Sequence, residues 1–314
     1  MAYEIGGKVV FITGAARGIG AATARRLADR GAKVALVGLE PELLEKLADE
    51  IGADKAVWFE ADVTDLDGLE RAAEGTVDKL GGIDVAIANA GVSPMTPTMA
   101  LDPDLFDKTI AVNLGGVYRT LKATVPHVTA RSGYVLSVAS LAALAQAPMM
   151  GAYAASKAGV EALSNSVRSE IVHTGAKVGV AYLSFIDTDM VRRGFDSAAG
   201  QRAQQRMGGP FGRRAPVSAV AKAIERGIER RARTVAVPSW VRPLVHVRTL
   251  VQSGMEREVR RRGIDDILAE AGAEPQELTT PQPDGVGAGA VDTDRPPAGE
   301  GPASGRHVAA SGTL

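Results

Sequence analysis

The order of short apolar runs along the chain most constrains its fold. Seven runs rich in β-branched residues precede residue 240, and stretches with helical spacing, such as "ELLEKLADEI" and "DGLERAAEGTVDKL", lie between them. The runs span residues 8–13, 33–38, 56–59, 84–89, 133–140, 177–183 and 234–238. Continuously apolar strands that alternate with helices are typical of a parallel sheet covered on both faces. We therefore predict an α/β fold with a doubly wound, mostly parallel sheet of seven strands.

The pattern changes after Trp240. Residues 241–272 contain two further helical segments, of which the first is amphipathic and is expected to be broken early by Pro243. Arginines outnumber glutamates by six to two in 240–263, and no other charged residue lies there. A basic amphipathic helix either packs on the core as an arm or lies on an anionic membrane surface. We favour the packing arm.

The last segment is rich in helix-breaking residues. Residues 273–314 contain six prolines and seven glycines, 13 of 42 positions, and few large apolar side chains. Such a segment has little to bury, so we expect a disordered, low-complexity tail without a catalytic role. The predicted organisation is a sheet domain at 1–240, a helical extension at 241–272 and a tail at 273–314.

Bulk properties exclude several classes of protein. The balance of 36 Lys and Arg against 37 Asp and Glu gives a formal net charge of −1, which argues against a dedicated nucleic-acid binder. The chain has no cysteine, and its four histidines lack the spacing of metal ligands, so no metal site is expected. The N-terminus does not resemble a signal peptide, and no apolar run reaches the roughly 18 residues of a membrane span. These properties favour a soluble, cytoplasmic protein.

Three glycines mark the turn after the first strand. Gly14, Gly18 and Gly20 lie between the strand at 8–13 and a helix, and a second strand follows that helix. Glycine lets the backbone approach a ligand closely, and the helix N-terminus offers free N–H groups to a pyrophosphate. A glycine-rich turn is also a plain turn in many proteins, but this strand–helix–strand context favours a dinucleotide site.

A tyrosine and a lysine stand four residues apart among small residues in "MMGAYAASKAGVEAL". On a helix, Tyr153 and Lys157 share a face. At about 5 Å and a dielectric near 20, an ammonium stabilises a phenolate by roughly 3 kcal/mol, which lowers the tyrosine pKa by about two units. Tyr153 would then serve as a general acid/base near neutral pH. The alternative is an ordinary helix face with a solvated lysine and a packing tyrosine.

These motifs, taken in order, resemble the short-chain dehydrogenase/reductase family. Its glycine motif has the Thr-Gly-x-x-x-Gly-x-Gly form found here, and the resemblance continues over roughly residues 5–240. It includes "ADV" at 61–63, "NAG" at 89–91, Asn113, Ser140 and the Tyr153–Lys157 pair. The resemblance implies an NAD(P)-binding Rossmann fold, an oxidoreductase activity on alcohols or ketones, and a homodimer or homotetramer.

The resemblance also implies roles for single residues. Ser140, Tyr153, Lys157 and Asn113 form the catalytic set, in which Ser140 positions the substrate oxygen and Asn113 completes a proton relay through Lys157. The implied cofactor-binding residues are Gly14, Arg17, Gly18, Ile19, Gly20, Asp62, Val63, Asn89, Ala90, Gly91, Tyr153, Lys157, Ile186 and Thr188. Asp62 as part of a helix N-terminus, and Thr188 as an ordinary cap, are the plain alternatives.

The chain departs from the family pattern at two places. Ser184–Phe185 stands where Pro-Gly is usual before Thr188, in a loop that forms one wall of the nicotinamide site. The end of the second strand holds Gly38 instead of an acidic residue that would select NAD. Arg17 can contact the 2′-phosphate of NADP as a bidentate partner, whereas Glu40 argues the other way. We favour NADP over NAD.

The residues that flank the catalytic set are mostly apolar. Candidate substrate contacts are Ser93, Met95, Leu141, Met149, Met150, Phe185 and Phe195. No cluster of arginines is present among them to bind a carboxylate or phosphate, so a lipophilic secondary alcohol or ketone is expected as the small-molecule substrate. Two alternative functions remain open. One is a dinucleotide sensor or scaffold without turnover, and the other is a lipid-surface reductase that docks through 240–262.

Overall fold

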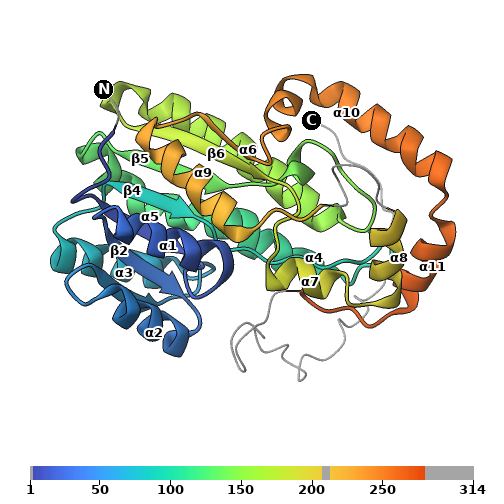
Figure 1. The fold of residues 1–314 in the computed structure, drawn as a ribbon, viewed down its shortest axis with the longest axis horizontal. Coiled ribbons are helices and arrows are strands. Elements are labelled where there is room, and N and C mark those ends of the chain that lie inside the picture. The colour runs from blue at the N-terminus through green and yellow to red at the C-terminus, as the bar shows by residue number, and fades with distance from the viewer. Residues whose placement is uncertain (1–2, 207–212, 280–314) are drawn as a thin grey trace, which may run out of the picture. The chain divides into compact units, whose positions relative to one another are not determined.

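A seven-stranded sheet forms the centre of the part that the structure, a computed structural model, describes, namely residues 3–206 and 213–279 (Figure 1). Its strands are β1 (Val9–Thr13), β2 (Lys33–Gly38), β3 (Ala56–Glu60), β4 (Val85–Ala88), β5 (Tyr134–Val138), β6 (Lys177–Leu183) and β7 (Thr234–Val237). Their order is β3-β2-β1-β4-β5-β6-β7, and all six pairings are parallel. The predicted doubly wound sheet is confirmed; six of the predicted apolar runs contain a whole strand, and β3 extends one residue beyond its run.

Side chains of the central strands are buried on both faces of the sheet. In β1, Val10 and Ile12 join the core on one face and Phe11 joins the core on the other, as the two-residue period of a strand requires. Three helices cover the first face: α1 (Gly18–Asp29), α2 (Pro41–Ile51) and α9 (Val217–Glu229). Three others cover the second: α3 (Leu66–Leu80), α5 (Gly116–Ala130) and α6 (Gly151–Ile171). Burial on both faces explains why the strands lack polar alternation.

The strand order reverses between β1 and β4. From β1 the chain continues to β2 and β3 on one side, and β4 pairs with β1 on the other side. The helices that follow β1 and β4 therefore leave the sheet on different faces, and a crevice opens at the carboxyl ends of these strands. Thr13 at the end of β1 and Asn89 just after β4 meet there.

A π-helical turn interrupts the helix that precedes β5. The backbone runs without a break through α4 (Pro103–Ile110), the π-helix η1 (Ala111–Gly115) and α5. Asn113 is fully buried at the centre of this turn. Isolated π-turns of this kind are frequent at functional sites, because they re-aim one side chain without ending the helix.

Two helices follow the sheet, as expected from the change in pattern after Trp240. They are α10 (Val241–Arg262) and α11 (Asp265–Ala273), and α10 packs on the core through Leu244 and Val245. The expected early break is present in α10, but it lies at Val247 and not at Pro243. Pro243 lies in the first turn of α10, where the missing N–H has no helical acceptor, and the non-helical residue of α10 is Val247 (φ −118°, ψ 21°).

Residues 274–279, within the range assigned to the tail, lie against the sheet domain. Leu278 forms an isolated antiparallel bridge with Pro94, and the Thr279 N–H and hydroxyl both donate to the Ser93 carbonyl at 2.9 and 2.7 Å. The rest of the predicted tail, 280–314, lies outside the described residues. The remaining short elements are η2 (Leu141–Ala143), η3 (Val172–Thr174), α7 (Asp189–Gly194) and α8 (Ala198–Arg206). None of the described helices is long and apolar enough to cross a membrane.

Candidate active site

The turn between β1 and α1 is built on glycines that no other residue can replace. Gly14 has φ +64°, and a Cβ there would lie 2.9 Å from the Ala90 Cα. A Cβ on Gly20 would lie 2.1 Å from the Gly14 carbonyl oxygen. Arg17, at the N-cap of α1, makes no side-chain capping bond to the helix. The N-terminal N–H groups of α1 therefore face a narrow glycine-lined turn, which fits the pyrophosphate of a dinucleotide.

Asn89 fastens this turn to the neighbouring strand. Its Nδ2 donates to the carbonyls of Thr13 and Gly14 at 3.0 and 3.1 Å, and its N–H donates to the Thr13 hydroxyl at 3.1 Å. These bonds hold the ends of β1 and β4 at a fixed separation beside the glycine turn. Ala90 and Gly91 follow directly, so the "NAG" segment forms one side of the crevice.

The predicted adenine-side and nicotinamide-side residues line the same carboxyl edge of the sheet. Asp62 accepts from the Thr64 N–H at 2.8 Å in the turn after β3, and Val63 beside it is buried. Thr188 is the N-cap of α7, and its hydroxyl accepts from the Val191 N–H at 3.4 Å. In this structure Thr188 therefore acts as a helix cap, as the plain alternative proposed. Asp62 is not the cap of α3, because Asp65 occupies that position.

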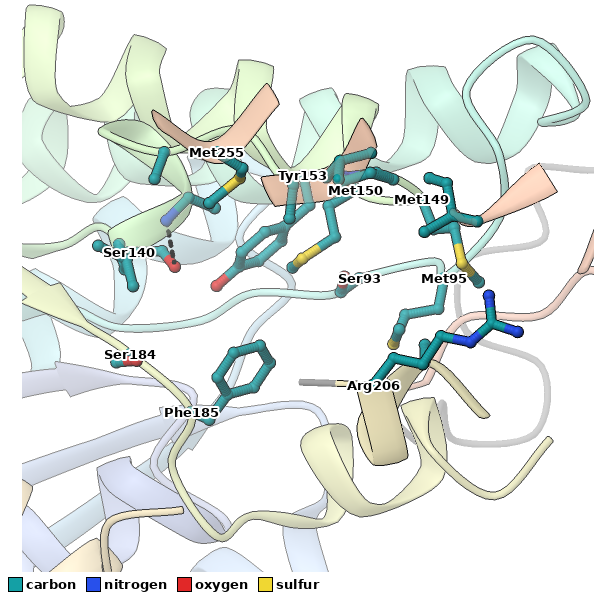
Figure 2. A pocket seen from close by; sticks show the side chains of 18 of the residues that line it. Ser93, Met95, Ser140, Met149, Met150, Tyr153, Ser184, Phe185, Arg206 and Met255 are labelled. Carbon is teal, nitrogen blue, oxygen red and sulfur yellow. Dashed lines mark hydrogen bonds between the residues drawn. The ribbon is translucent and has the colours of Figure 1, made fainter. Parts of the chain in front are cut away.

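Ser140 and Tyr153 bring their hydroxyl groups together at the inner end of a cavity. Ser140 follows β5, donates to the Leu183 carbonyl at 3.2 Å and accepts from the Ala142 N–H at 3.1 Å, so its position is fixed by two main-chain bonds. Tyr153 comes from the first turns of α6, and its hydroxyl points toward Ser140 past the ring of Phe185 (Figure 2). A substrate oxygen placed between the two hydroxyls can accept hydrogen bonds from both.

Lys157 and Asn113 lie behind Tyr153 in the protein interior. The Lys157 Nζ donates to the Val138 carbonyl at 2.8 Å and lies 5.7 Å from the Tyr153 ring centre. Asn113 donates to the Val92 carbonyl at 2.9 Å and to the Ser156 hydroxyl at 3.0 Å, and it accepts from the Val92 N–H at 2.8 Å. The structure therefore brings all four predicted catalytic residues to one region.

Ser156 links these groups and was missed by sequence reasoning. Its hydroxyl accepts from Asn113 and donates to the Tyr153 carbonyl at 2.7 Å, so it fixes the π-turn against the helix that carries Tyr153. The sequence feature that could have identified Ser156 is its position directly before Lys157. This feature is weak, because small residues fill the whole stretch. Ser156 is fully buried.

Burial changes the pKa of both titratable groups. Desolvation raises the pKa of Tyr153, and a hydrogen bond with Ser140 acts in the opposite direction. Desolvation lowers the pKa of Lys157 to about 8. The expectation that Lys157 brings the Tyr153 pKa toward neutrality is wrong for the protein alone, because it counted the attraction of the ammonium and left out the cost of burying a phenolate.

We expect Lys157→Met to stabilise the fold at neutral pH. A pKa of about 8 in place of 10.5 means that charged Lys157 costs the folded state about 3 kcal/mol. Below pH 8 Lys157 is protonated in both the folded and the unfolded state, so the full destabilisation is present. Between pH 8 and 10.5 the unfolded state binds more protons than the folded state, so the stability of wild type rises with pH. The variant also loses the hydrogen bond to Val138, which destabilises it by about 1 kcal/mol. The net increase in the free energy of unfolding is therefore about 2 kcal/mol at pH 7.

Urea unfolding at pH 7, 8.5 and 9.5 measures this gain. The difference between wild type and Lys157→Met should narrow as pH rises, whereas Lys122→Met, which removes an exposed lysine of α5, should give a small difference at every pH. A Lys157→Met protein that is less stable than wild type at pH 7, or a gap that does not change with pH, would contradict the assignment of Lys157 as a costly buried cation.

A cavity of about 430 Å³ opens from Ser140 and Tyr153 (Figure 2). The seven residues proposed from the sequence as substrate contacts all line it: Ser93, Met95, Leu141, Met149, Met150, Phe185 and Phe195. Phe185, which stands where the family usually has glycine, packs against Phe195 with ring centres 5.8 Å apart. The departure from Pro-Gly therefore adds an aromatic wall to the cavity. Among residues 3–206 and 213–279 no cluster of side chains suited to a metal ion is found.

Sequence reasoning missed a large part of the cavity wall. Side chains of α10 and α11 complete it, and Arg206 of α8 and Thr279 also contribute. The apolar positions of α10 were visible in the sequence, but a packing arm and a cavity wall give the same pattern.

Comparison with known proteins agrees with this geometry. A family model described as short chain dehydrogenase matches residues 8–198, well over half of the chain. The chain belongs to the short-chain dehydrogenase family. It is therefore an oxidoreductase of the family that acts on CH–OH groups.

Two curated short-chain dehydrogenases show the extent of the likeness. Short-chain dehydrogenase reductase 5 of Arabidopsis thaliana is 39% identical over 182 residues, which cover 57% of this chain and 70% of that protein. D-threitol dehydrogenase of Mycolicibacterium smegmatis is 33% identical over 201 residues, which cover 63% and 77%. Glycine betaine reductase ATRR of Emericella nidulans is 35% identical over 198 residues, but these make up 16% of that protein.

Among solved structures, levodione reductase superposes with a TM-score of 0.68 at 28% identity, covering 74% of this chain and 96% of that one. A short-chain dehydrogenase/reductase from Burkholderia phymatum, solved in complex with NAD, has a TM-score of 0.70 at 22% identity and shows the shared fold, over 79% of this chain and 95% of that one. The family match ends at residue 198, so α10 and α11 lie beyond it.

Proposed function

We propose that this short-chain dehydrogenase interconverts an apolar secondary alcohol and its ketone with NADP(H). The observation that carries the proposal is the pair of Ser140 and Tyr153 hydroxyls at the inner end of an apolar cavity, with Lys157 one helical turn behind and the glycine turn of β1–α1 at the same sheet edge. When bound, the nicotinamide cofactor supplies or accepts the hydride.

The residues of the chain manage the proton. In the direction of reduction, the substrate carbon gains a hydride and its carbonyl oxygen gains the proton of the Tyr153 hydroxyl, so that an alcohol forms and Tyr153 is left as a phenolate. In this proposal Ser140 turns its hydroxyl proton from the Leu183 carbonyl to the same oxygen and stabilises the charge that develops on it, while the Ala142 N–H holds the Ser140 oxygen in place. Lys157, whose pKa is about 8, then stabilises the phenolate and supplies the proton that restores the Tyr153 hydroxyl. Oxidation runs through the reverse steps.

A raised Tyr153 pKa suits this role in the reducing direction. A tyrosine that stays protonated at neutral pH is ready to donate, and the ammonium of Lys157 lowers the cost of the phenolate only once it forms. The hydrogen bonds from Asn113 to Val92 and Ser156 keep the π-turn and α6 in place, so that this geometry does not relax when charge moves.

The coenzyme preference is proposed from Arg17. Its guanidinium lies 2.8 Å from the Glu40 carboxylate, and both side chains are partly exposed next to the end of β2. Gly38, the last residue of β2, has no side chain that could repel a 2′-phosphate. This ion pair supports the proposal that Arg17 binds the 2′-phosphate and that Glu40 orients the guanidinium in its absence.

We expect Arg17→Gln to lower kcat/KM with NADPH by roughly tenfold or more, because a charge-assisted hydrogen bond is lost, and to change kcat/KM with NADH by less than about threefold. Glu40→Gln is the matched variant; it removes the competing carboxylate and should shift the preference toward NADPH. Steady-state kinetics with both coenzymes test the pair. Equal losses with NADPH and NADH in Arg17→Gln would contradict the proposed phosphate contact.

A panel of apolar ketones and secondary alcohols, assayed with NADPH and NADH in parallel, tests the activity itself. Turnover of apolar members together with weak or no turnover of carboxylated ones is the expected result. Dinucleotide binding without any turnover would instead favour the sensor or scaffold function.

We also propose a homo-oligomer. Phe106 on α4 and Tyr118 on α5 are exposed aromatic side chains on the helices that, by family resemblance, face a second subunit. Sedimentation equilibrium measures this state directly.

A further inference from the structure

The cavity extends from Tyr153 to a wall that the short-chain dehydrogenase match does not include. Helix α10 contributes Val251, Gly254, Met255 and Val259 among others, and α11 contributes Ile267 and Leu268. These residues lie more than 50 positions beyond the end of the family match at residue 198. The inner end of the cavity, with the reacting groups, and its outer wall therefore come from separate parts of the sequence.

Gly254 is the single glycine of α10, and no feature of the helix requires it. Its backbone is helical, and a Cβ placed on it would have no atom within 4 Å. Glycine inside a helix lowers the stability of the helix, so a glycine that the backbone does not require needs an explanation outside the helix itself. Gly254 is exposed and lines the cavity on the same face of α10 as Val251 and Met255, so a side chain there would enter open space at the edge of the cavity.

Each charged side chain that lines the cavity is in an ion pair, although Asp266, the partner of Arg206, lies outside the lining and Glu258 is shared by Arg261 and Arg262. Arg206 binds Asp266 at 2.7 Å, and Arg262 binds Glu258 at 2.5 Å. The remaining lining is dominated by methionine, phenylalanine and aliphatic side chains, which carry no counter-charge. A ligand carboxylate or phosphate would have to break one of these ion pairs, so the cavity favours an uncharged ligand.

We propose that α10 and α11 form the substrate-selecting wall, that the cavity takes an elongated, uncharged apolar ketone or alcohol, and that the absence of a side chain at Gly254 sets the size of substrate accepted. This inference rests on the proposed function for the reaction that the ligand undergoes, whereas the binding of the ligand in the cavity does not depend on it. Met255, which neighbours Gly254 and overlies Tyr153 in Figure 2, is the adaptable part of the same wall.

The test compares Gly254→Leu with wild type on straight-chain 2-alkanones from butan-2-one to tridecan-2-one. A leucine at this position fills cavity space, so kcat/KM for the longest ketone should fall by roughly tenfold or more while that for butan-2-one stays within about twofold. Ser253→Leu is the matched control, since Ser253 is the exposed neighbour on α10 and does not line the cavity. It should leave the whole series unchanged.

A second arm tests the predicted neutrality of the ligand. 12-Oxotridecanoate has the chain of tridecan-2-one with a terminal carboxylate, and wild type should use it less well than the neutral ketone. A clear preference for the carboxylate would overturn the proposal and assign Arg206 or Arg262 as its partner.

A binding readout separates this inference from the proposed activity. Tridecan-2-one should raise the melting temperature of wild type and of Ser253→Leu but not that of Gly254→Leu. That pattern without turnover in wild type would sink the proposed function and leave the inference standing. Turnover in wild type with the same loss for every ketone in Gly254→Leu would sink the inference alone. Gly254→Ala, expected to melt above wild type because it favours the helix, gives an intermediate effect should the leucine variant fail to fold.

Discussion

Replacing Tyr153 with phenylalanine should lower kcat by about 10³-fold, because it removes the proton donor while keeping the ring. The ring lies in the cavity wall next to Met150, so the phenylalanine variant retains this packing. The substitution removes only the hydroxyl and its hydrogen bond with Ser140, so the free energy of unfolding should stay within about 1 kcal/mol of that of wild type. Single-turnover reduction of a ketone, followed by nicotinamide absorbance, measures the change in the chemical step.

Tyr118→Phe is the control for this substitution. Tyr118 is half-exposed on α5 and outside the cavity, so the same loss of a hydroxyl should leave kcat within about twofold of wild type. Coenzyme affinity, measured by fluorescence titration, should be nearly unchanged in both variants. A Tyr153→Phe protein that keeps more than a tenth of wild-type kcat would show that another group donates the proton.

The second large effect is expected from Gly20→Ala. The added methyl carbon would lie 2.1 Å from the Gly14 carbonyl oxygen and 2.9 Å from the Ala15 Cα, which are main-chain atoms that cannot turn aside. The turn between β1 and α1 must shift, and overpacking of this kind costs roughly 3 kcal/mol. The N–H groups that face the pyrophosphate move with it, so dinucleotide affinity should fall by about a hundredfold.

Gly38→Ala provides the matched control near the same turn. A methyl group there meets Leu44 and Ala16 at 3.7–3.8 Å, which is ordinary van der Waals contact, and the backbone of Gly38 does not need glycine. Its free energy of unfolding should stay within about 1 kcal/mol of wild type. Urea denaturation without coenzyme compares the two variants. Equal stabilities for Gly20→Ala and Gly38→Ala would mean that the β1–α1 turn is more adaptable than its close contacts indicate.

The sheet and the reacting groups could be predicted from sequence because they depend on local patterns. The strands give seven apolar runs, of which the central ones are continuously buried, and parallel pairing follows from the helices between them. Gly14, Gly20 and Tyr153 stand at fixed offsets within single elements, so a motif records their relation. The same holds for Ser140, which ends the run that contains β5.

Other features depend on contacts between distant segments. The direction of the Tyr153 pKa shift follows from burial, which the spacing to Lys157 does not encode. The π-turn around Asn113 is a change of main-chain register inside a helical sequence. The cavity wall formed by α10 depends on where an amphipathic helix docks, and its apolar face looks the same whether it meets a core or a ligand.

The position of α10 and α11 after the sheet has a consequence for how such a chain can diversify. Neither helix contributes a strand pairing, a catalytic hydroxyl or a glycine of the β1–α1 turn. On the proposed role of these helices, substitutions at the cavity-facing positions of 241–273 would change which ligand is accepted and leave the proton-transfer groups in place. Related chains with the same first two hundred residues but different C-terminal helices would then carry out the same reaction on different ligands.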